Sequence, residues 1–251
     1  MHCFICPTYG CYDYARAAVK SFFEHTPSGV VVIVDDAHPG FHKFWDDKWN
    51  VIAHQFKQRR GLTRSWNYGL IQARNIGAKY AICGNSDILF TPGWDLGPTA
   101  LLEDDTVGLV GPLSNAPGLI SPKRNVWDQK QNIWDHVTGY EPSSTPERLA
   151  GVSAHLARLY KATDHLPVRA VNGFFMIGRT ASWWEGKYDK RHVFNPAPRY
   201  AMIGNEMELQ RRHLARGWRS LVSLRTYIFH YRSVTRGEKF KVGMWHRNQP
   251  S

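Results

Sequence analysis

The chain has 251 residues, of which 43% are hydrophobic and 21% charged, a composition typical of a folded globular protein that excludes a disordered chain. Lys and Arg outnumber Asp and Glu by 32 to 21, and a net charge of +11 favours an anionic substrate or a polyanionic partner. No apolar run reaches the roughly 20 residues that span a bilayer, and no signal peptide precedes the first predicted strand, so we expect a cytoplasmic protein.

The first hundred residues alternate between predicted strands and helices. We expect strands at residues 2–6, 30–34, 50–54 and 80–84, and amphipathic helices at 12–24 and 63–76. The continuous β-branched run from Val30 to Val34 is typical of a strand buried on both faces of a parallel sheet. The order β-α-β-β-α-β therefore predicts a parallel sheet with helices on its faces.

The four cysteines are Cys3, Cys6, Cys11 and Cys83. Cys3 and Cys6 have the C-x-x-C spacing of a zinc or redox site, but on a strand they point to opposite faces. No second pair of Cys or His residues follows at metal-binding spacing. We therefore predict that all four are small buried hydrophobic residues.

Polar side chains follow several of the predicted strands. Thr8 follows the first, Asp35-Asp36 the second and Asn85-Ser86-Asp87 the fourth. Ligands of open α/β sheets bind at the carboxyl ends of the strands, so these groups are expected at one edge. Asp87 fits a site for a hard divalent cation, which binds one or two carboxylates plus substrate phosphates. A plain turn is the alternative, because Asn, Ser and Asp all favour turns.

The pattern is looser beyond residue 105. We expect strands at 107–110, 168–177, 221–224 and 227–230, helices at 145–161 and 205–216, and a loop at 112–146 with a short helix near 127–136. Pro146 opens the first of these helices and Gly217 caps the second. With no repeat and no clear linker, we predict one domain over 1–251, with a nucleotide-binding half at 1–105 and an acceptor-binding half at 106–251 that ends in a basic segment.

Four blocks of the sequence resemble inverting glycosyltransferases of the GT-A fold, in particular the family 2-like enzymes. They are Ile5-Cys-Pro-Thr-Tyr9, Val32-Ile-Val-Asp-Asp36, Gly61-Leu-Thr-Arg-Ser-Trp-Asn-Tyr-Gly69 and the segment from Tyr80 to Trp94. In order, they are similar to the opening P-T-Y loop, the paired acids that contact uridine, the helix start beside the nucleotide and the D-x-D strand. Two weaker blocks, 204–212 and 228–233, resemble the helix with the catalytic base and the segment with a metal-binding His.

This resemblance implies an α/β protein of the GT-A fold, with a Rossmann-like nucleotide-binding half, a mixed and mostly parallel sheet, and an acceptor-binding half. It also implies transfer of a sugar from a nucleotide-sugar, most often a UDP-sugar, with Mn²⁺ or Mg²⁺. The chain departs from the family twice. The D-x-D motif is Asn85-Ser86-Asp87, which keeps only the last carboxylate, and the E-D pair is Asn205-Glu206.

The resemblance also implies roles for individual residues. Asp87 and His230 are expected to bind the metal, and Glu206 to act as the catalytic base. The residues expected to bind the acceptor are Asn172, Gly173, Trp183 and Trp184. The residues expected to bind the donor are Pro7, Thr8, Tyr9, Asp35, Asp36, Arg64, Asn67, Asn85, Ser86, Asp87, Arg232 and Arg236. Glu208 is the alternative base, and the two cannot both face one acceptor because they point in different directions on a helix. His230 as a core histidine and the Trp pair as packing are the alternative interpretations.

The sequence leaves the acceptor open between two hypotheses. One is a polyanion, for which DNA with hydroxymethylated bases, as in some bacteriophages, is the leading candidate. The other is a cell-surface glycan or its lipid-linked precursor, with the basic face of the protein on an anionic membrane. A non-catalytic protein of the same fold that binds nucleotides or nucleic acid is the third possibility, since the D-x-D motif is altered.

Overall fold

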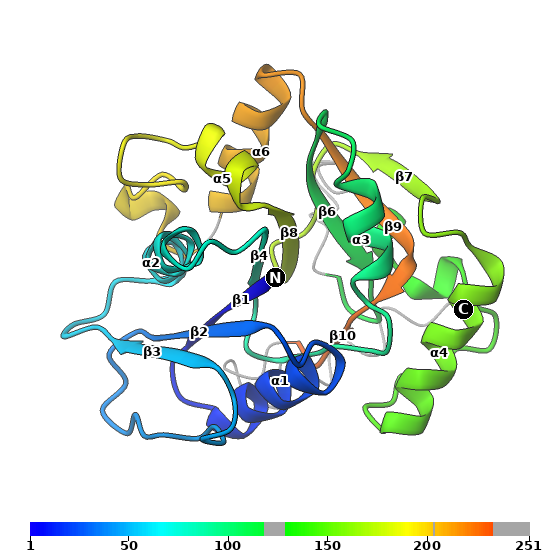
Figure 1. Cartoon of the computed structure of the whole chain (residues 1–251), viewed down its shortest axis with the longest axis horizontal. Coiled ribbons are helices and arrows are strands. Elements are labelled where there is room, and N and C mark those ends of the chain that lie inside the picture. Colours follow the sequence, from blue (N-terminus) through cyan, green and yellow to red (C-terminus); the bar gives the residue numbers. More distant parts are fainter. Residues whose placement is uncertain (118–128, 203, 233–251) are drawn as a thin grey trace.

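The computed structural model describes residues 1–117, 129–202 and 204–232 (Figure 1). Within these residues, the main feature is an eight-stranded sheet in the order β3-β2-β1-β4-β8-β6-β9-β7. Its strands are β1 His2–Thr8, β2 Val30–Asp35, β3 Val51–Gln55, β4 Tyr80–Gly84, β6 Val107–Leu113, β7 His165–Val168, β8 Phe175–Arg179 and β9 Arg219–Tyr227. A small antiparallel ribbon pairs β5, Ile88–Leu89, with β10, Phe229–His230.

The helices surround this sheet. They are α1 Tyr12–His25, α2 Leu62–Asn75, α3 Leu96–Leu101, α4 Pro146–Leu159, α5 Thr180–Glu185 and α6 Asn205–Ala215. Short 3₁₀ turns lie at Gln129–Gln131, Ile133–Asp135 and Pro198–Tyr200. Across the part of the chain described, no helix is both long and apolar enough to cross a membrane.

The directions of the strands define one functional edge. The pairs β1–β2, β1–β4, β2–β3 and β6–β9 are parallel, whereas β8 is antiparallel to both β4 and β6, and β7 is antiparallel to β9. Strands β1, β2, β3, β4, β6 and β9 therefore end at the same edge of the sheet. The segments that follow them meet there, as the alternation in the first hundred residues predicts.

The side chains of β1 divide the core into two layers. Cys3 and Ile5 pack in the layer that includes α2, α5 and α6, whereas Phe4 and Cys6 pack with α1 and α3. Figure 1 shows α2, α5 and α6 on one side of β1–β3 and α1 on the other. Cys3 and Cys6 lie on opposite faces, which confirms their structural interpretation. Cys11 is exposed and has a φ of 52°, so the prediction of its burial is wrong.

The second half of the chain differs from the prediction at one turn. The predicted strand at 168–177 is two strands, β7 and β8, separated by the loop 169–174. The loop turns at Asn172, whose side-chain Oδ1 accepts a hydrogen bond from the backbone N–H of Phe174 at 3.1 Å. An Asn-Gly sequence favours turns, and here that local preference overrides the β-branched pattern.

Other elements of the second half also differ from the prediction, either because predicted strands join or because the helices are too short to predict. The predicted strands at 221–224 and 227–230 form the single strand β9 and the short β10. The helix expected near 127–136 is a pair of 3₁₀ turns where it is described, and residues 118–128 lie outside the described part. Helices α3 and α5 have six residues each, which is too few to show a helical period.

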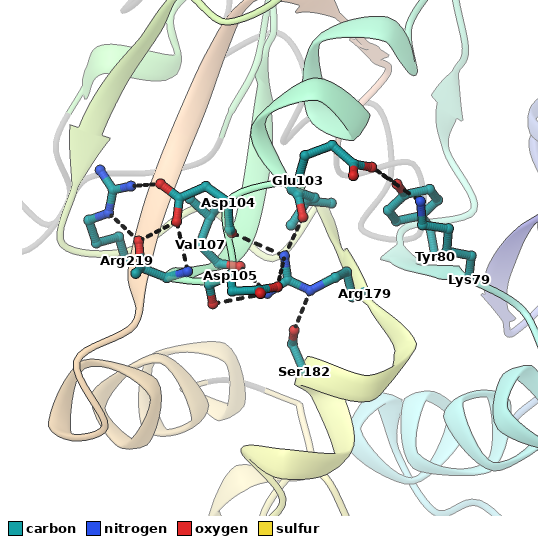
Figure 2. A network of polar contacts seen from close by, with 11 residues as sticks. Lys79, Tyr80, Glu103, Asp104, Asp105, Val107, Arg179, Ser182 and Arg219 are labelled. Atoms are coloured by element: carbon teal, nitrogen blue, oxygen red, sulfur yellow. Dashed lines mark hydrogen bonds and ion pairs between the residues drawn. The ribbon is translucent and has the colours of Figure 1, made fainter.

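Arg179 at the end of β8 holds together the opposite edge of the sheet (Figure 2). Its guanidinium donates hydrogen bonds to the backbone carbonyls of Leu102, Asp104, Asp105 and Val107, and its Nε donates to Ser182. Only 17% of its side chain is exposed. A single side chain therefore satisfies the carbonyl groups of the turn between α3 and β6.

Replacing Arg179 with Met is expected to lower the free energy of unfolding by about 3 kcal/mol, because the hydrogen bonds that this largely buried guanidinium donates to four backbone carbonyls and to Ser182 are lost at once. Arg219→Met is the matched control. It breaks an ion pair with Asp104 whose two side chains are 45% and 50% exposed, and pairs of that kind contribute less than about 1 kcal/mol. Urea unfolding of both variants measures their losses of stability, and equal losses would contradict this role of Arg179.

His213 in α6 makes the stability of the fold dependent on pH. The residue is 1% exposed, and neither ring nitrogen has a hydrogen-bond partner within the described residues. Burial, together with the nearby Arg212 and Arg216, lowers the pKa of His213 from 6.5 to about 3. The unfolded chain therefore binds one more proton between these two pKa values, and stability falls as the pH drops through that window.

We expect the His213 contribution to lower the free energy of unfolding by about 3 kcal/mol between pH 7 and pH 4. A His213→Leu variant lacks this proton-linked loss. Urea unfolding at the two pH values should therefore show a smaller decrease for the variant than for the wild type, and identical decreases would refute the buried neutral imidazole.

Candidate functional site

Asp35 supports the edge where β1 and β2 end. Its side chain is fully buried, and its Oδ2 accepts hydrogen bonds from the hydroxyls of Thr8 and Tyr12 at 3.1 and 2.9 Å. Its Oδ1 accepts from the backbone N–H of His38 at 2.8 Å and from Gln55 at 3.2 Å. These protein donors contact both oxygens of Asp35, and the direct donor contact of Thr8 and Asp35 stays a prediction. Together they support the loop after β2.

Asp36 links this edge to the start of α2. Its carboxylate accepts hydrogen bonds from the backbone N–H groups of Arg60 and Gly61, the latter at 3.0 Å to both oxygens. The guanidinium of Arg59 lies 4.1 Å from the ring centre of Tyr9, with its Nε 3.7 Å from Asp36. Tyr9 is 37% exposed, so an accessible aromatic ring and a cation lie beside each other where β1 and β2 end. Pro7, also predicted to bind the donor, is half-buried within β1.

The loop after β4 brings the predicted metal-binding pair together. The Oδ1 of Asp87 lies 3.2 Å from the Nε2 of His230, and the side-chain amide of Asn85 lies 3.3 Å from the same nitrogen. The backbone carbonyl of Asp87 accepts a hydrogen bond from Tyr231, which continues the β5–β10 ribbon. Residues separated by more than 140 positions thus meet at the carboxyl end of β4. Ser86 between them is half-buried.

The orientation of the His230 ring follows from its contacts. Its Nδ1 lies 2.7 Å from the carbonyl oxygen of Ala116, and because a carbonyl only accepts, Nδ1 carries the hydrogen. The ring stacks on Phe174 with a centre distance of 5.0 Å and an angle of 13°. Nε2 is therefore directed at Asp87. A metal-binding His is typically held in this way, through a hydrogen bond from its other nitrogen.

The donor atoms of this pair fit a divalent cation. Two ligands at about 2.1 Å from an octahedral ion and at right angles lie about 3.0 Å apart, close to the observed separation. Among the described residues, no cluster of three or more His, Cys, Asp or Glu side chains could hold a metal ion. Asp87 and His230 would thus hold an ion that takes its other ligands from phosphates and water, the mode that Mg²⁺ favours.

The two acids at the start of α6 have different surroundings. Glu208 forms a bidentate ion pair with Arg212, in which both nitrogen–oxygen distances are 2.9 Å. Glu206 has no ion-pair partner within the described residues, and burial raises its carboxyl pKa. Of the two acids, Glu206 is therefore the one available to accept a proton, which agrees with the order of the sequence blocks.

The loop 169–174 connects Glu206 with the Asp87–His230 pair. A β-carbon built on Gly173 would lie 3.3 Å from the carboxyl carbon of Glu206. On the next residue, Phe174, the ring stacks on His230 and the carbonyl accepts a hydrogen bond from the N–H of Asn85 at 2.9 Å. Since Gly173 has no side chain, space remains beside the carboxyl group of Glu206.

Two glutamines that the sequence analysis did not identify hold this loop. Gln131 accepts a hydrogen bond from the N–H of Asn172 at 2.8 Å and donates to the carbonyl of Pro112. Gln210 accepts from the N–H of Val171 at 2.8 Å and donates to the carbonyl of the same residue. Their roles arise only from tertiary contacts, so no local sequence signal marks them.

Three residues predicted to bind substrates make structural contacts in the fold. Asn67 accepts hydrogen bonds from the N–H groups of Val193 and Phe194 and donates to the carbonyl of Phe194. Trp183 is fully buried and Trp184 is 9% exposed, and their indole N–H groups donate to backbone carbonyls of β4 and α2. Tertiary packing thus uses the polar groups of all three residues, and the donor contact of Asn67 and the acceptor contact of the Trp pair stay predictions.

The structure describes two of the three arginines predicted to bind the donor. Arg64 lies in the first turn of α2, half-buried and with no ion pair within the described residues. Arg232 follows β10 two residues after His230, with a φ of 59°. Arg236 lies outside the described residues.

No protein-family model and no curated protein matches the chain in sequence. Solved structures match it in fold. GalNAc-T7 with UDP, GalNAc and Mn²⁺ has a TM-score of 0.63 at 15% identity, over 92% of this chain and 43% of that one. S. aureus TarS 1–349 has a TM-score of 0.54 at 16% identity, over 91% and 60%. The mannosyltransferase PcManGT from Pyrobaculum calidifontis, in complex with GDP-Man and Mn²⁺, has a TM-score of 0.56 at 14% identity, over 100% and 65%.

The chain thus spans less than two thirds of each of these proteins. At such identities the likeness establishes the fold, which confirms the predicted α/β architecture of the GT-A type, with a mixed and mostly parallel sheet.

Proposed function

We propose that this protein of the GT-A fold is a metal-dependent inverting glycosyltransferase, which moves a sugar from a nucleotide-sugar to a hydroxyl group. The observation that carries the proposal is the arrangement at the sheet edge. Asp87 and His230, 3.2 Å apart, lie at one end of the loop that also contacts Glu206. Two of the matched structures named above, GalNAc-T7 and PcManGT, are complexes with UDP or GDP-Man and Mn²⁺, which supports a nucleotide-sugar donor, for which UDP-sugar is our first choice.

In this proposal Asp87 and His230 hold Mn²⁺ or Mg²⁺. When bound, the ion supplies positive charge against the diphosphate leaving group as the glycosidic bond breaks. Arg64 and Arg232 provide further positive charge near the same edge, where fixed cations stabilise developing negative charge. Tyr9, Arg59 and Asp36 provide the surface for the base and ribose where β1 and β2 end.

Glu206 is the general base of the proposed reaction. It takes the proton of the acceptor hydroxyl while the hydroxyl oxygen bonds to the anomeric carbon and the bonding electrons leave with the diphosphate. Its raised pKa makes it a better base than an exposed carboxylate. One base and one direct attack invert the anomeric centre. Asn172 and Gly173, beside Glu206, would border the acceptor.

We further propose an acceptor that is polyanionic, with hydroxymethylated DNA as the leading candidate and a cell-surface glycan or its lipid-linked precursor as the alternative. From Lys48 to Ser86 the sequence contains no Asp or Glu. Within it, Lys57, Arg59 and Arg60 are exposed, and the adjoining helix α2 contacts 199–201 through the hydrogen bond from Thr63 N–H to the carbonyl of Ala201. Asn205, next to Glu206, donates to the Thr63 hydroxyl, so this basic surface adjoins the proposed base.

Binding of the acceptor should depend on salt. If about four phosphates are neutralised, the affinity for duplex DNA should fall about 100-fold between 50 and 200 mM salt. Arg199 is exposed in the turn that α2 contacts, and so belongs to the same basic surface as Arg60. Replacing both Arg60 and Arg199 with Ala should flatten this salt dependence, whereas Arg158→Ala on α4 should leave it unchanged. Fluorescence anisotropy measures all three proteins, and affinity that does not vary with salt would exclude a polyanionic acceptor.

A donor screen tests the proposed activity itself. Thermal shift with a panel of UDP-, GDP- and TDP-sugars, with and without Mn²⁺ or Mg²⁺, should show stabilisation by one nucleotide family that requires the metal. No shift with any nucleotide-sugar would contradict the proposal and favour a non-catalytic protein of this fold.

A further inference from the structure

Two residues that follow β6, Asn115 and Ala116, fix His230 in place. The Oδ1 of Asn115 accepts a hydrogen bond from the backbone N–H of His230 at 2.9 Å, and its Nδ2 donates to the carbonyl of His230 at 3.0 Å. The carbonyl of Ala116 accepts from the His230 ring. Asn115 and His230 are each 5% exposed, so water does not replace these bonds easily. One short segment therefore holds both the backbone and the imidazole of His230.

The segment 114–116, which holds His230, is itself anchored to the fold. Ser114 donates its backbone N–H to the carbonyl of Gln131 at 2.8 Å, and its own carbonyl accepts from Ile133 at 3.0 Å. The side chain of Ser114 accepts a hydrogen bond from the N–H of Ala116 at 3.3 Å. The 3₁₀ turns at 129–135, rather than the β5–β10 ribbon, thus set the position of the segment 114–116.

The ribbon alone gives His230 little support. Strands β5 and β10 have two residues each, and an isolated ribbon of that length is unstable without other contacts. The amide of Asn115 carries a donor and an acceptor in one plane, and these match the carbonyl and N–H of a single residue. A Ser or an Ala side chain cannot reach both groups.

We propose that Asn115 is a positioning residue of the metal site, which holds His230 so that its Nε2 meets the carboxylate of Asp87. This inference rests on the proposed function, since it assigns the Asp87–His230 pair to a cation. Residues that orient a metal ligand in this way affect metal affinity about 10- to 100-fold when replaced. Neither Asn115 nor the segment 114–116 belongs to the sequence blocks that carry the resemblance to glycosyltransferases.

The test measures Mn²⁺ binding to the full chain by electron paramagnetic resonance. We expect Asn115→Ala and the polar Asn115→Ser to bind Mn²⁺ about 10- to 100-fold more weakly than the wild type. Saturating Mn²⁺ should restore most of kcat, which a general loss of structure would not allow. Asn195→Ala is the matched control, because Asn195 is 6% exposed and its Oδ1 accepts a local bond from the N–H of Ala197, far from His230 in the sequence. Its Mn²⁺ affinity should not change.

The possible failures are distinct. A folded Asn115→Ser protein that binds Mn²⁺ within about twofold of the wild type overturns the positioning role while the proposed function stands. Loss of kcat that saturating Mn²⁺ does not restore, in a variant with normal Mn²⁺ affinity, also overturns it. A wild type that binds no Mn²⁺, with or without nucleotide, overturns both the metal site and the role of Asn115.

Discussion

Replacing Glu206 with Gln is expected to lower kcat by about 10²- to 10⁴-fold, the usual contribution of a general base. The substitution keeps the shape of the side chain and removes only its capacity to take a proton, so the affinity for the nucleotide-sugar and for Mn²⁺ should not change. Steady-state kinetics and donor titration of the variant measure the two quantities separately.

Glu208→Gln is the matched control for this experiment, since Glu208 lies two residues further along α6, points in a different direction and is paired with Arg212. It should lose the ion pair with Arg212, and with it some stability, while kcat stays near the wild-type value. If Glu208→Gln reduces kcat as strongly as Glu206→Gln does, the assignment of the base is wrong.

The pH dependence of the rate supplies a second test of Glu206. A general base acts in its ionised form, so kcat should fall as the pH drops through the pKa of Glu206. Because burial raises that pKa, the acidic limb should lie above the ordinary range of a glutamate. An acidic limb at the position of an exposed carboxylate would contradict the buried base.

The same burial affects stability in the opposite sense. A carboxyl group with a raised folded-state pKa stabilises the fold below its unfolded pKa, and this stability is lost as the pH rises through the folded value. At neutral pH the ionised Glu206 therefore destabilises the fold. Glu206→Gln should unfold at a higher temperature than the wild type even though it is nearly inactive, an exchange of stability for activity that is typical of functional sites.

Replacing Asp87 with Asn is expected to abolish measurable Mn²⁺ binding and to reduce turnover at least about 100-fold, comparable to the loss of a main electrostatic stabiliser. The amide keeps the volume of the side chain and removes the negative charge that faces His230. Electron paramagnetic resonance gives the Mn²⁺ affinity, and release of nucleoside diphosphate gives the turnover.

Asp105→Asn controls for the general loss of an acid. The Asp105 side chain is 99% exposed and lies in the Arg179 network at the opposite edge of the sheet (Figure 2). The Mn²⁺ affinity and the turnover of the Asp105→Asn variant should equal those of the wild type. Normal Mn²⁺ binding and turnover in Asp87→Asn would remove Asp87 from the proposed metal site.

The first half of the fold is predictable from the sequence because its signals are local. The β-branched run at Val30–Val34 and the apolar faces of α1 and α2 give the strand and helix periods directly. Parallel pairing then places Asp36 and Asp87 at one edge, as observed.

The site is less predictable where function and packing use the same residue types. Asp35 and Asn67 have the expected chemistry, but the protein itself takes up their polar atoms. Conversely, the supports of the site, Asn115, Gln131 and Gln210, are ordinary amides whose partners lie far away in the sequence. Pairings of this kind depend on the three-dimensional fold and leave no periodic or local pattern.

The most direct test of the proposed function is the anomeric configuration of the product. The donor selected by thermal shift is incubated with the protein and Mn²⁺, and proton NMR follows the anomeric signals as nucleoside diphosphate is released. We predict release that stops when EDTA removes the metal, with a first product of inverted configuration. Release of a product with retained configuration would contradict direct attack assisted by Glu206, and the absence of release from every donor would contradict a glycosyltransferase altogether.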